Sequence, residues 1–310
     1  MEEHFLSLPN ELYIHFNFDL QTLINLSMIS SHINSKLSNI NYKIINRDIR
    51  FNLSKIGSKW IKNINNVTIA DIACLKAFKG QLNIITIIGR HKYIDIQILE
   101  NFVNLRILNF ATRGFLCLVP LTNLVHLSKL DLSCTLISCL LPLTRLSKLQ
   151  TLNLFYTEIF DISPLATLTS LQKLNLANTC VVDIFPLSNL LNLRKLRLSN
   201  TFVSNISPLC NLTSLVKLEL SATLVQCILP LANLKHLHTL ELFSSKIEDI
   251  SILSKIDSLE ILDLGCTGVR DITDLRGLKH LRLLNLTGNN IINTHSEIMD
   301  QIPTLENIYT

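Results

Sequence analysis

The chain has 310 residues and a net charge of +4, which is long enough for a substantial core and too weakly basic to indicate nucleic-acid binding by itself. Its mean hydropathy of +0.35 is high, but leucines alternate with polar residues and no apolar run reaches membrane-spanning length. The first residues, MEEHFLSL, lack the basic and apolar regions of a secretory signal. We therefore expect an intracellular, cytoplasmic protein with no membrane partner, in its own cell or in that of a host.

The first 50 residues are predicted to form a small helical module. Apolar residues recur there at the three- and four-residue steps of a helix, at Leu12, Phe16, Leu23, Leu26 and Ile29. Pro9 suits the first turn of a helix, because its fixed φ matches the helix and its missing N–H has no partner there anyway. A unit of this size is marginally stable alone, so we expect the rest of the chain or a partner to support it.

This front module resembles the F-box, whose pattern is LPxELLxxIxxxL, then DLxxL, then LxxVSxxW. The matching residues are Leu8, Pro9, Glu11, Leu12, Phe16, Leu23, Leu26, Ile29 and Ser30. The resemblance implies that an apolar face binds a Skp-type adaptor and, through it, a cullin-RING ubiquitin ligase. The adaptor-binding residues it implies are Leu8, Pro9, Leu12, Phe16 and Leu23. The stretch between Phe16 and Leu23 is about two residues shorter than in the family, and Ile33 or a neighbour replaces the usual tryptophan.

Residues 51–104 are predicted to join this module to a repeat array and to contain about two degenerate repeats. The segments DIACLKAFKGQL (71–82) and DIQILENFVNL (95–105) resemble the return limb of the repeats described next, although the spacing between them slips.

Residues 105–293 form nine rows of 22 residues that align without gaps. Each row contains a pair of apolar residues separated by one position, at 108/110, 130/132, 152/154, 174/176, 196/198, 218/220, 240/242, 262/264 and 284/286. Three residues after each pair from the second row onward stands a small polar residue: Thr135, Thr157, Thr179, Thr201, Thr223, Ser245, Thr267 and Asn289. The period of two predicts a short strand with its leucines inward, and the polar column predicts a turn in which side chains satisfy backbone groups.

The remainder of each row, for example DISPLATLTSL, leaves room only for a short helical or 3-10 turn that a proline starts. Stacked rows bury leucines that one row alone cannot bury, so the rows should form a parallel sheet roughly 40 Å long. The pattern resembles the leucine-rich repeat family, and DISPL resembles its internalin-type subfamily. The predicted fold is therefore an α/β leucine-rich repeat solenoid with a parallel concave sheet and short convex limbs, preceded by the all-α F-box-like module.

The last segment, residues 294–310, is longer than one row and shows helical spacing at Ile298, Ile302 and Leu305. We expect it to cap the C-terminal end of the core, because the end rows of a solenoid must cover their apolar faces.

The concave face is the predicted target-binding site. The residues that flank the strand leucines place a basic cluster, Lys173, Lys195, Arg197 and Lys217, beside an acidic strip, Glu219, Glu241 and Asp263. Phe155 and Phe243 fall in an outward column that otherwise holds mainly Ala, Ser, Gly and Thr, and exposed aromatic residues are typical binding anchors. Solvated charges that only keep the face soluble are the alternative interpretation.

No catalytic, phosphate-binding or metal-binding motif occurs in the sequence, and the eight cysteines show no metal-ligand spacing. We therefore expect reduced thiols, no cofactor, no metal and no enzymatic activity. The predicted function is a substrate-recruiting subunit of a cullin-RING ubiquitin ligase, with an unidentified target protein on the repeats. The alternatives are a scaffold protein whose front helices only cap the solenoid, and, more distantly, an internalin-like surface binder.

Overall fold

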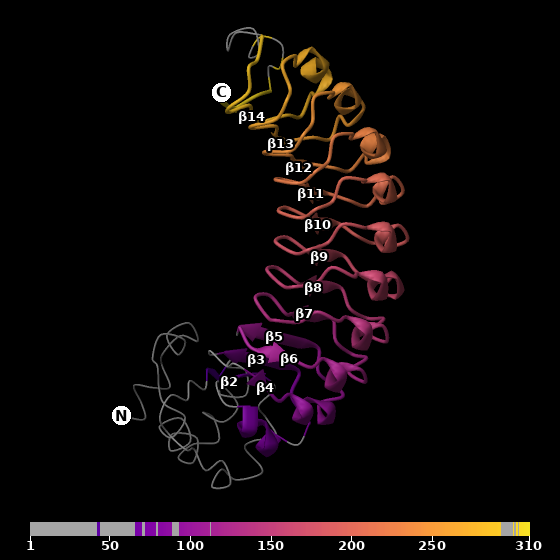
Figure 1. The fold of residues 1–310 in the computed structure, drawn as a ribbon, viewed down its shortest axis with the longest axis vertical. Coiled ribbons are helices and arrows are strands. Elements are labelled where there is room, and N and C mark those ends of the chain that lie inside the picture. Colours follow the sequence, from indigo (N-terminus) through magenta and orange to yellow (C-terminus); the bar gives the residue numbers. More distant parts are fainter. Residues whose placement is uncertain are drawn as a thin grey trace, which may run out of the picture.

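The computed structural model describes residues 42–43, 66–69, 72–78, 80–88, 93–111, 113–292, 300, 302 and 304–310. The segment that the sequence predicts to form the F-box-like module, with Leu8, Pro9, Leu12, Phe16 and Leu23, lies outside the described residues. The described part of the chain is an arc in which strands line the inner side and short 3-10 turns line the outer side (Figure 1).

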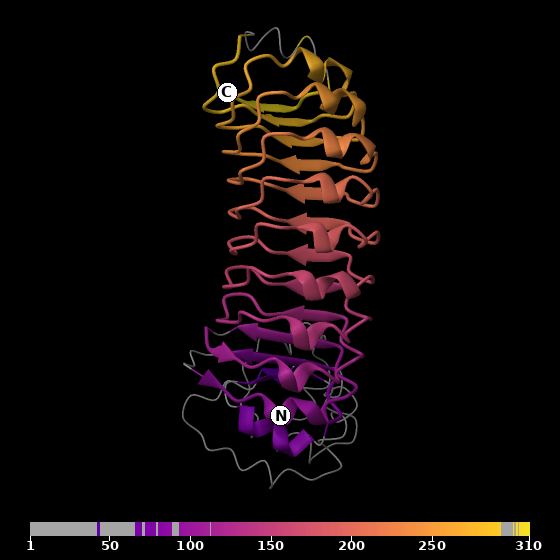
Figure 2. The same cartoon turned by 45° about the vertical axis from the view of Figure 1, so that its right-hand side comes forward.

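The inner side is a parallel sheet that contains 13 strands within the described residues. In spatial order they are β1 (Tyr42–Lys43), β2 (Asn66–Ile69), β3 (Ile84–Ile88), β5 (Ile107–Ala111), β7 (Lys129–Asp131), β8 (Thr151–Asn153), β9 (Lys173–Asn175), β10 (Lys195–Arg197), β11 (Lys217–Glu219), β12 (Thr239–Glu241), β13 (Ile261–Asp263), β14 (Leu283–Asn285) and β15 (Asn307–Tyr309). A separate pair joins β4 (Tyr93–Ile94) to β6 (Phe115–Leu116). The strands stack along the long axis with all their arrows in the same direction (Figure 2).

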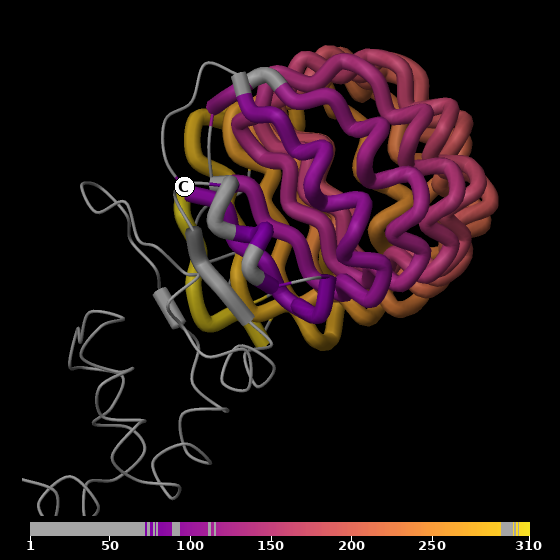
Figure 3. The backbone as a smooth tube through the Cα atoms, turned by 90° about the horizontal axis from the view of Figure 1, so that it is seen from below, coloured from indigo at the N-terminus to yellow at the C-terminus, as the bar shows by residue number. Residues whose placement is uncertain are grey.

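The outer side consists of 3-10 turns, which confirms the short convex limbs that the sequence predicts. They are η2 (Ile72–Phe78), η3 (Gln97–Asn101), η4 (Val119–Leu121), η5 (Leu141–Leu143), η6 (Ser163–Thr167), η7 (Phe185–Leu187), η8 (Ser207–Leu209), η9 (Leu229–Asn233), η10 (Ser251–Lys255) and η11 (Thr273–Gly277). From η4 to η9 a proline stands at the start of the turn, as expected from its fixed φ. Viewed along the solenoid, successive rows overlay as loops of similar outline (Figure 3).

From β5 to β14 the register between neighbouring strands is one whole row, so that each leucine stacks on its equivalent. Leu196 of β10, for example, pairs with Leu174 of β9 and Leu218 of β11. These side chains belong to one buried cluster that runs from Leu75 to Leu305. The solenoid has a single continuous core, and each row contributes to it through its two neighbours.

Both ends of the sheet extend beyond the regular rows. At the N-terminal end, β1 lies inside the first 50 residues, where the sequence predicts a helical module, and pairs with β2. At the C-terminal end, Ile302 and Leu305 are buried in the core. The last residues then form β15, which pairs with β14 and which helical spacing does not predict. Within the described residues, no helix is long and apolar enough to cross a bilayer.

The turn after each strand is fixed by the column of threonines. In six rows the threonine hydroxyl donates to the carbonyl oxygen of the second strand leucine, three residues earlier, at 2.5 to 2.8 Å. The residue before the threonine has a positive φ in each of these rows, for instance 57° at Asn200. The threonine therefore satisfies a buried carbonyl at the point where the chain leaves the sheet.

Ser245 departs from this arrangement. Its hydroxyl Oγ is buried and, among the described residues, has no hydrogen-bond partner. A Ser245→Thr substitution should raise the free energy of unfolding by about 1 kcal/mol, because the threonine rotamer of the other rows would bring the hydroxyl to the Leu242 carbonyl. Urea unfolding followed by circular dichroism would measure the change, and a midpoint at or below that of the wild type would contradict it.

The chain enters the outer turns through a second polar column. The carboxylate or amide Oδ1 of Asp161, Asp183, Asn205, Asp249 and Asp271 accepts a hydrogen bond from the backbone N–H two residues later. Cys117, Cys139 and Cys227 stand at the same position in other rows, and all three are free thiols exposed to solvent. The carboxylates of this column are expected to make the stability of the fold depend on pH.

The backbone hydrogen bonds from Ser163, Ser251 and Thr273 lower the pKa values of Asp161, Asp249 and Asp271 below the ordinary 3.8. A carboxyl whose pKa is lower in the folded state stabilises the fold above its unfolded pKa and loses this contribution as the pH falls through the folded value. We expect an Asp161→Asn/Asp249→Asn/Asp271→Asn variant, which keeps the accepting oxygen, to lose less stability than the wild type between about pH 5 and pH 2.5. Equal losses in chemical denaturation across this range would contradict the assignment.

Candidate protein-binding face

The concave face is formed by the outward residues of the strands and by the residue that follows the second leucine of each row. Lys173, Lys195 and Lys217 begin β9, β10 and β11 and pair in register, so their side chains leave the sheet side by side. Arg197, Glu219, Glu241 and Asp263 end β10 to β13 and form a second register line. The structure thus brings all seven predicted charged residues onto one surface.

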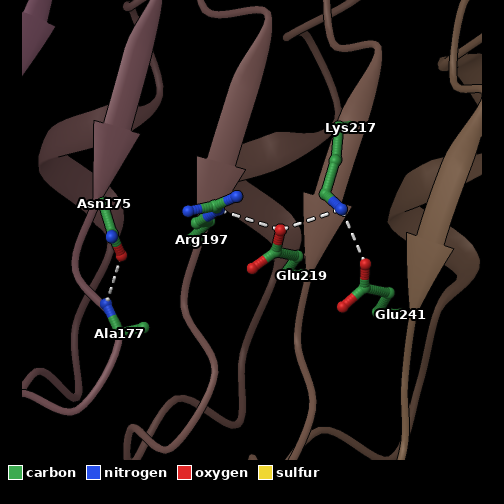
Figure 4. Close-up of polar contacts among 6 residues, drawn as sticks. All are labelled: Asn175, Ala177, Arg197, Lys217, Glu219 and Glu241. Carbon is green, nitrogen blue, oxygen red and sulfur yellow. Dashed lines mark hydrogen bonds and ion pairs between the residues drawn. The ribbon is translucent and has the colours of Figure 1, made fainter. Parts of the chain in front are cut away.

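A chain of ion pairs crosses β10, β11 and β12, and we call it the relay; its members are Arg197, Glu219, Lys217 and Glu241 (Figure 4). Arg197 Nε donates to Glu219 Oε1 at 2.9 Å, Lys217 Nζ lies 3.0 Å from the same oxygen, and Lys217 Nζ donates to Glu241 Oε1 at 2.7 Å. The sequence predicts a basic cluster beside an acidic strip. The structure differs, because Lys217 stands between two carboxylates and its charge is neutralised within the face.

The Lys217 ammonium is held in its charged form. Partial burial alone would lower its pKa, but the hydrogen bonds to Glu241 and Glu219 and their negative charges outweigh the burial and raise the pKa above its ordinary value. Lys217 therefore keeps its positive charge across the physiological pH range.

The relay replaces a structural hydrogen bond that other rows keep. The residue at the end of the strand is Asp or Asn in most rows, and its Oδ1 accepts a hydrogen bond from the backbone N–H two residues later. The residues that form this cap are Asp131, Asn153, Asn175, Asp263 and Asn285. Figure 4 shows this cap between Asn175 and the Ala177 N–H. Arg197, Glu219 and Glu241 are the departures, and no such cap forms in their rows among the described residues. Three consecutive rows thus carry long charged side chains in place of a cap.

The remaining charged residues fall on either side of the relay. Lys173 and Lys195 are exposed, and within the described part of the chain neither makes an ion pair or a hydrogen bond through its side chain. Asp263, in contrast, has a structural role, since its Oδ1 also accepts the Asn285 amide at 2.9 Å. The face is therefore positive over β9 and β10, neutral over β11, and negative over β12 and β13.

Phe155 and Phe243 mark two separate points on the same surface, with 36% and 38% of each residue exposed. They lie four rows apart, roughly 19 Å at the usual strand spacing. A β-carbon at Gly265 would come within 2.7 Å of Phe243 Cδ2, so the ring occupies the space that glycine leaves open. The structure therefore presents two distinct aromatic positions, one just before the charged rows and one within them, beside Glu241.

The face offers recognition chemistry, namely charges, hydrogen-bond donors and acceptors, and two aromatic rings. Among the described residues, no group of three or more His, Cys, Asp or Glu side chains could hold a metal ion. The sequence contained a signal for the relay, because the three departures from the Asp/Asn column are visible there. Which carboxylate each cation contacts depends on side-chain conformation, and the column pattern does not encode it.

Neither a family model nor a curated protein sequence matches the chain, but many solved structures do. An internalin (inlF) from Listeria monocytogenes is 25% identical, with a TM-score of 0.71 and coverage of 94% of both chains. Internalin C2 (inlC2) from the same organism is 35% identical, with a TM-score of 0.54 over 54% of this chain and 74% of its own. TLR13, in its complex with ssRNA13, is 17% identical, with a TM-score of 0.71 over 88% of this chain and 43% of its own, and shares the fold alone.

The structure of this chain confirms the leucine-rich repeat solenoid that its sequence predicts. The register of one row per strand, the 3-10 outer turns and the single continuous core match the solenoid that the sequence predicts. Together with the identity to internalin C2 over most of that protein, these features show that the chain belongs to the leucine-rich repeat proteins of the internalin type.

Proposed function

We propose that the protein is a non-enzymatic binding module that holds a partner protein on its concave face. The observation that carries the proposal is the loss of the strand-end cap in the three rows of Arg197, Glu219 and Glu241. A stability-driven sequence would keep Asp or Asn there, as the other rows do. Departures from a local structural rule are expected where residues serve binding.

The charge pattern of the face defines the kind of partner. Lys173, Lys195 and Arg197 favour acidic groups, whereas Glu241 and Asp263, one and two rows beyond Lys217, favour basic ones. Phe155 and Phe243 provide two separate apolar anchors, after β8 and after β12. A partner surface with an acidic patch, a basic patch and two exposed apolar groups would be complementary to this arrangement.

A nucleic acid fits the face less well than a protein does. The TLR13 structure contains ssRNA13, and a polyanion of this kind needs a continuous basic surface. On the concave face of this chain, Glu219, Glu241 and Asp263 stand next to the cations and would repel phosphate groups. A protein partner is therefore the better match.

A comparison of matched variants tests this proposal. A Phe155→Ser/Phe243→Ser chain and a Leu229→Ser control, in which the substituted residue is exposed on the outer turn η9, would be used beside the wild type for affinity capture from eukaryotic cell extract. Proteins recovered by the wild type and the control but lost by the concave variant would then be purified and titrated. We expect the concave variant to bind at least about tenfold more weakly. Equal binding by both variants would contradict a concave site.

We also propose a more specific role, in which the F-box-like segment joins a bound target to a ubiquitin ligase. The support for this role is the order of the three sequence motifs ahead of the repeats. Co-purification with a eukaryotic Skp-type adaptor, with a Leu8→Asp/Pro9→Ala/Leu12→Asp chain as control, tests it separately from the concave face. Retention by the wild type alone, with unchanged circular dichroism, would support an adaptor role. Loss of the adaptor from both chains would leave the concave binding module as the function.

A further inference from the structure

A second surface, away from the concave face, exposes apolar side chains. It lies on the loops that run from the strand ends to the outer turns. We call it the apolar flank and define it by Phe160, Cys180, Val182, Phe202 and Leu224. Phe160, Val182, Phe202 and Leu224 are 65%, 58%, 56% and 42% exposed. Isolated exposed apolar residues are normal, but a contiguous group indicates an interaction site.

The backbone shows that these residues form one surface. The N–H of Cys180 donates to the Ile159 carbonyl at 3.0 Å, which places Cys180 beside Phe160 in the preceding row. In the same way, the Phe202 N–H bonds to Val181 at 3.0 Å, next to Val182, and the Leu224 N–H bonds to Val203 at 2.9 Å. Four successive loops are therefore fastened together, and their apolar side chains are neighbours.

The fold does not require apolar residues at these positions. In the following rows, Lys246 and Gly268 occupy the column of Phe202, and Glu248 and Arg270 occupy the column of Phe160. The same loop geometry persists there, since the Lys246 and Gly268 N–H groups make the equivalent bonds at 3.1 and 2.8 Å. These positions therefore accept charged residues or glycine as well as the apolar side chains found between Phe160 and Leu224.

Within the rows of the apolar flank, the charges on these loops are all negative, and Lys246 follows in the next row. Between positions 133 and 227, the loops that follow the strands contain Glu158, Asp161 and Asp183 and contain no Lys or Arg, in a chain whose net charge is +4. Asp161 and Asp183 each use Oδ1 to accept a backbone N–H, at 2.8 Å in both cases. The backbone hydrogen bond from Ser163 also lowers the pKa of Asp161, which keeps that carboxylate ionised. Glu158, Asp161 and Asp183 are all exposed to solvent, so their charges are accessible to a partner.

We propose that the apolar flank docks a cationic amphipathic segment of a partner protein, with the apolar face of that segment on Phe160, Val182 and Phe202 and its basic residues beside Glu158, Asp161 and Asp183. Charge complementarity selects this occupant. A second copy of the chain placed on the same flank would bring the two sets of carboxylates together, and an anionic lipid surface would be repelled by them. The proposal is independent of the concave site, because it uses different residues.

A titration of the full chain with synthetic peptides tests the proposal. The probe is a 14-residue peptide of Leu and Lys with leucines at i, i+3, i+4 and i+7, labelled for fluorescence anisotropy, and its control has Glu in place of Lys. The variants are Phe160→Ser/Phe202→Ser for the apolar surface and Glu158→Gln/Asp161→Asn/Asp183→Asn for the charges, which keeps both accepting oxygens. Leu191→Ser is the matched control, since Leu191 is 54% exposed in the loop that leads toward the next strand.

We expect the Leu/Lys peptide to bind the wild type and the Leu191→Ser and Phe243→Ser chains equally. The Phe160→Ser/Phe202→Ser chain should raise the Kd at least about tenfold, and the charge variant should raise it several-fold and reduce its salt dependence. The proposal is overturned if the Leu/Glu peptide binds as tightly, or if Leu191→Ser weakens binding as much. It is also overturned if the Phe160→Ser/Phe202→Ser change abolishes self-association in sedimentation, or abolishes binding to phosphatidylserine vesicles, because a second copy or a lipid surface would then be the occupant.

Discussion

Replacement of Leu196 by alanine is expected to lower the free energy of unfolding by about 3 kcal/mol. Leu196 is fully buried at the centre of the sheet and stacks between Leu174 and Leu218. Truncation removes apolar contacts with both neighbouring rows and leaves a cavity that the regular backbone ladder on each side cannot close. Urea denaturation monitored by circular dichroism would measure the loss.

Because Leu196 lies within a repeating array, the shape of the unfolding transition is informative as well as the loss in free energy of unfolding. Each row is stabilised mainly by its neighbours, so a weak row in the middle should allow the two halves to unfold separately. We expect a broader transition for Leu196→Ala than for the wild type. Lys195→Ala, on the exposed side of the same strand, should change stability by less than about 0.5 kcal/mol. An equal loss of stability in both variants would show that the stability of the array does not depend on the stacking of Leu196 between its neighbouring rows.

The second large effect is expected at Gly80, where alanine should destabilise the N-terminal rows by more than about 2 kcal/mol. Gly80 has a φ of +80°, and a β-carbon there would lie 2.1 Å from the backbone oxygen of Asn101. Neither the strained dihedral nor the backbone clash can be relieved by a side-chain rotation. The row that contains β3 would have to separate from the row that contains η3.

Hydrogen exchange would locate this effect. In Gly80→Ala, amides of β2 and β3 should lose protection while those of β10 to β13 keep it, because strain is transmitted only through adjacent rows. Gly277→Ala is the matched control, since its β-carbon would meet nothing closer than the Ser254 oxygen at 4.0 Å. That substitution should stabilise the chain slightly, by about 0.4 to 1 kcal/mol, through the reduced entropy of the unfolded state. Uniform loss of protection across all rows in Gly80→Ala would contradict a local clash.

Much of this architecture could be predicted from the sequence because the core follows a fixed period. The paired leucines determined the strands and their register, and the threonine column determined the turn. The positive φ before each threonine could not be predicted in the same way. Tyr156, Ala222 and Ser244 adopt it, at φ values between 53° and 56°, although their side chains disfavour that conformation. The repeated hydrogen bonds between rows impose it, and these depend on tertiary stacking.

The ends of the sheet and the charged relay show two further limits of the sequence pattern. β1 and β15 pair with their neighbours at separations of 25 and 24 residues, as in Tyr42 with Val67 and Leu284 with Ile308. A search for 22-residue rows misses both. On the concave face the sequence correctly placed Lys217 and Glu219 in neighbouring columns. It could not reveal that Lys217 bridges two carboxylates, because this depends on the conformation of a long, flexible side chain.

The stacking of whole rows has a consequence for how this surface can change. A row makes the same contacts wherever it is inserted, so duplication or deletion of 22 residues would preserve the core on either side. Such an event between Phe155 and Phe243 would alter their separation by one strand spacing, about 4.8 Å, and leave each local environment intact. The length of the recognised surface is therefore adjustable only in fixed increments, whereas its charge can be varied one residue at a time.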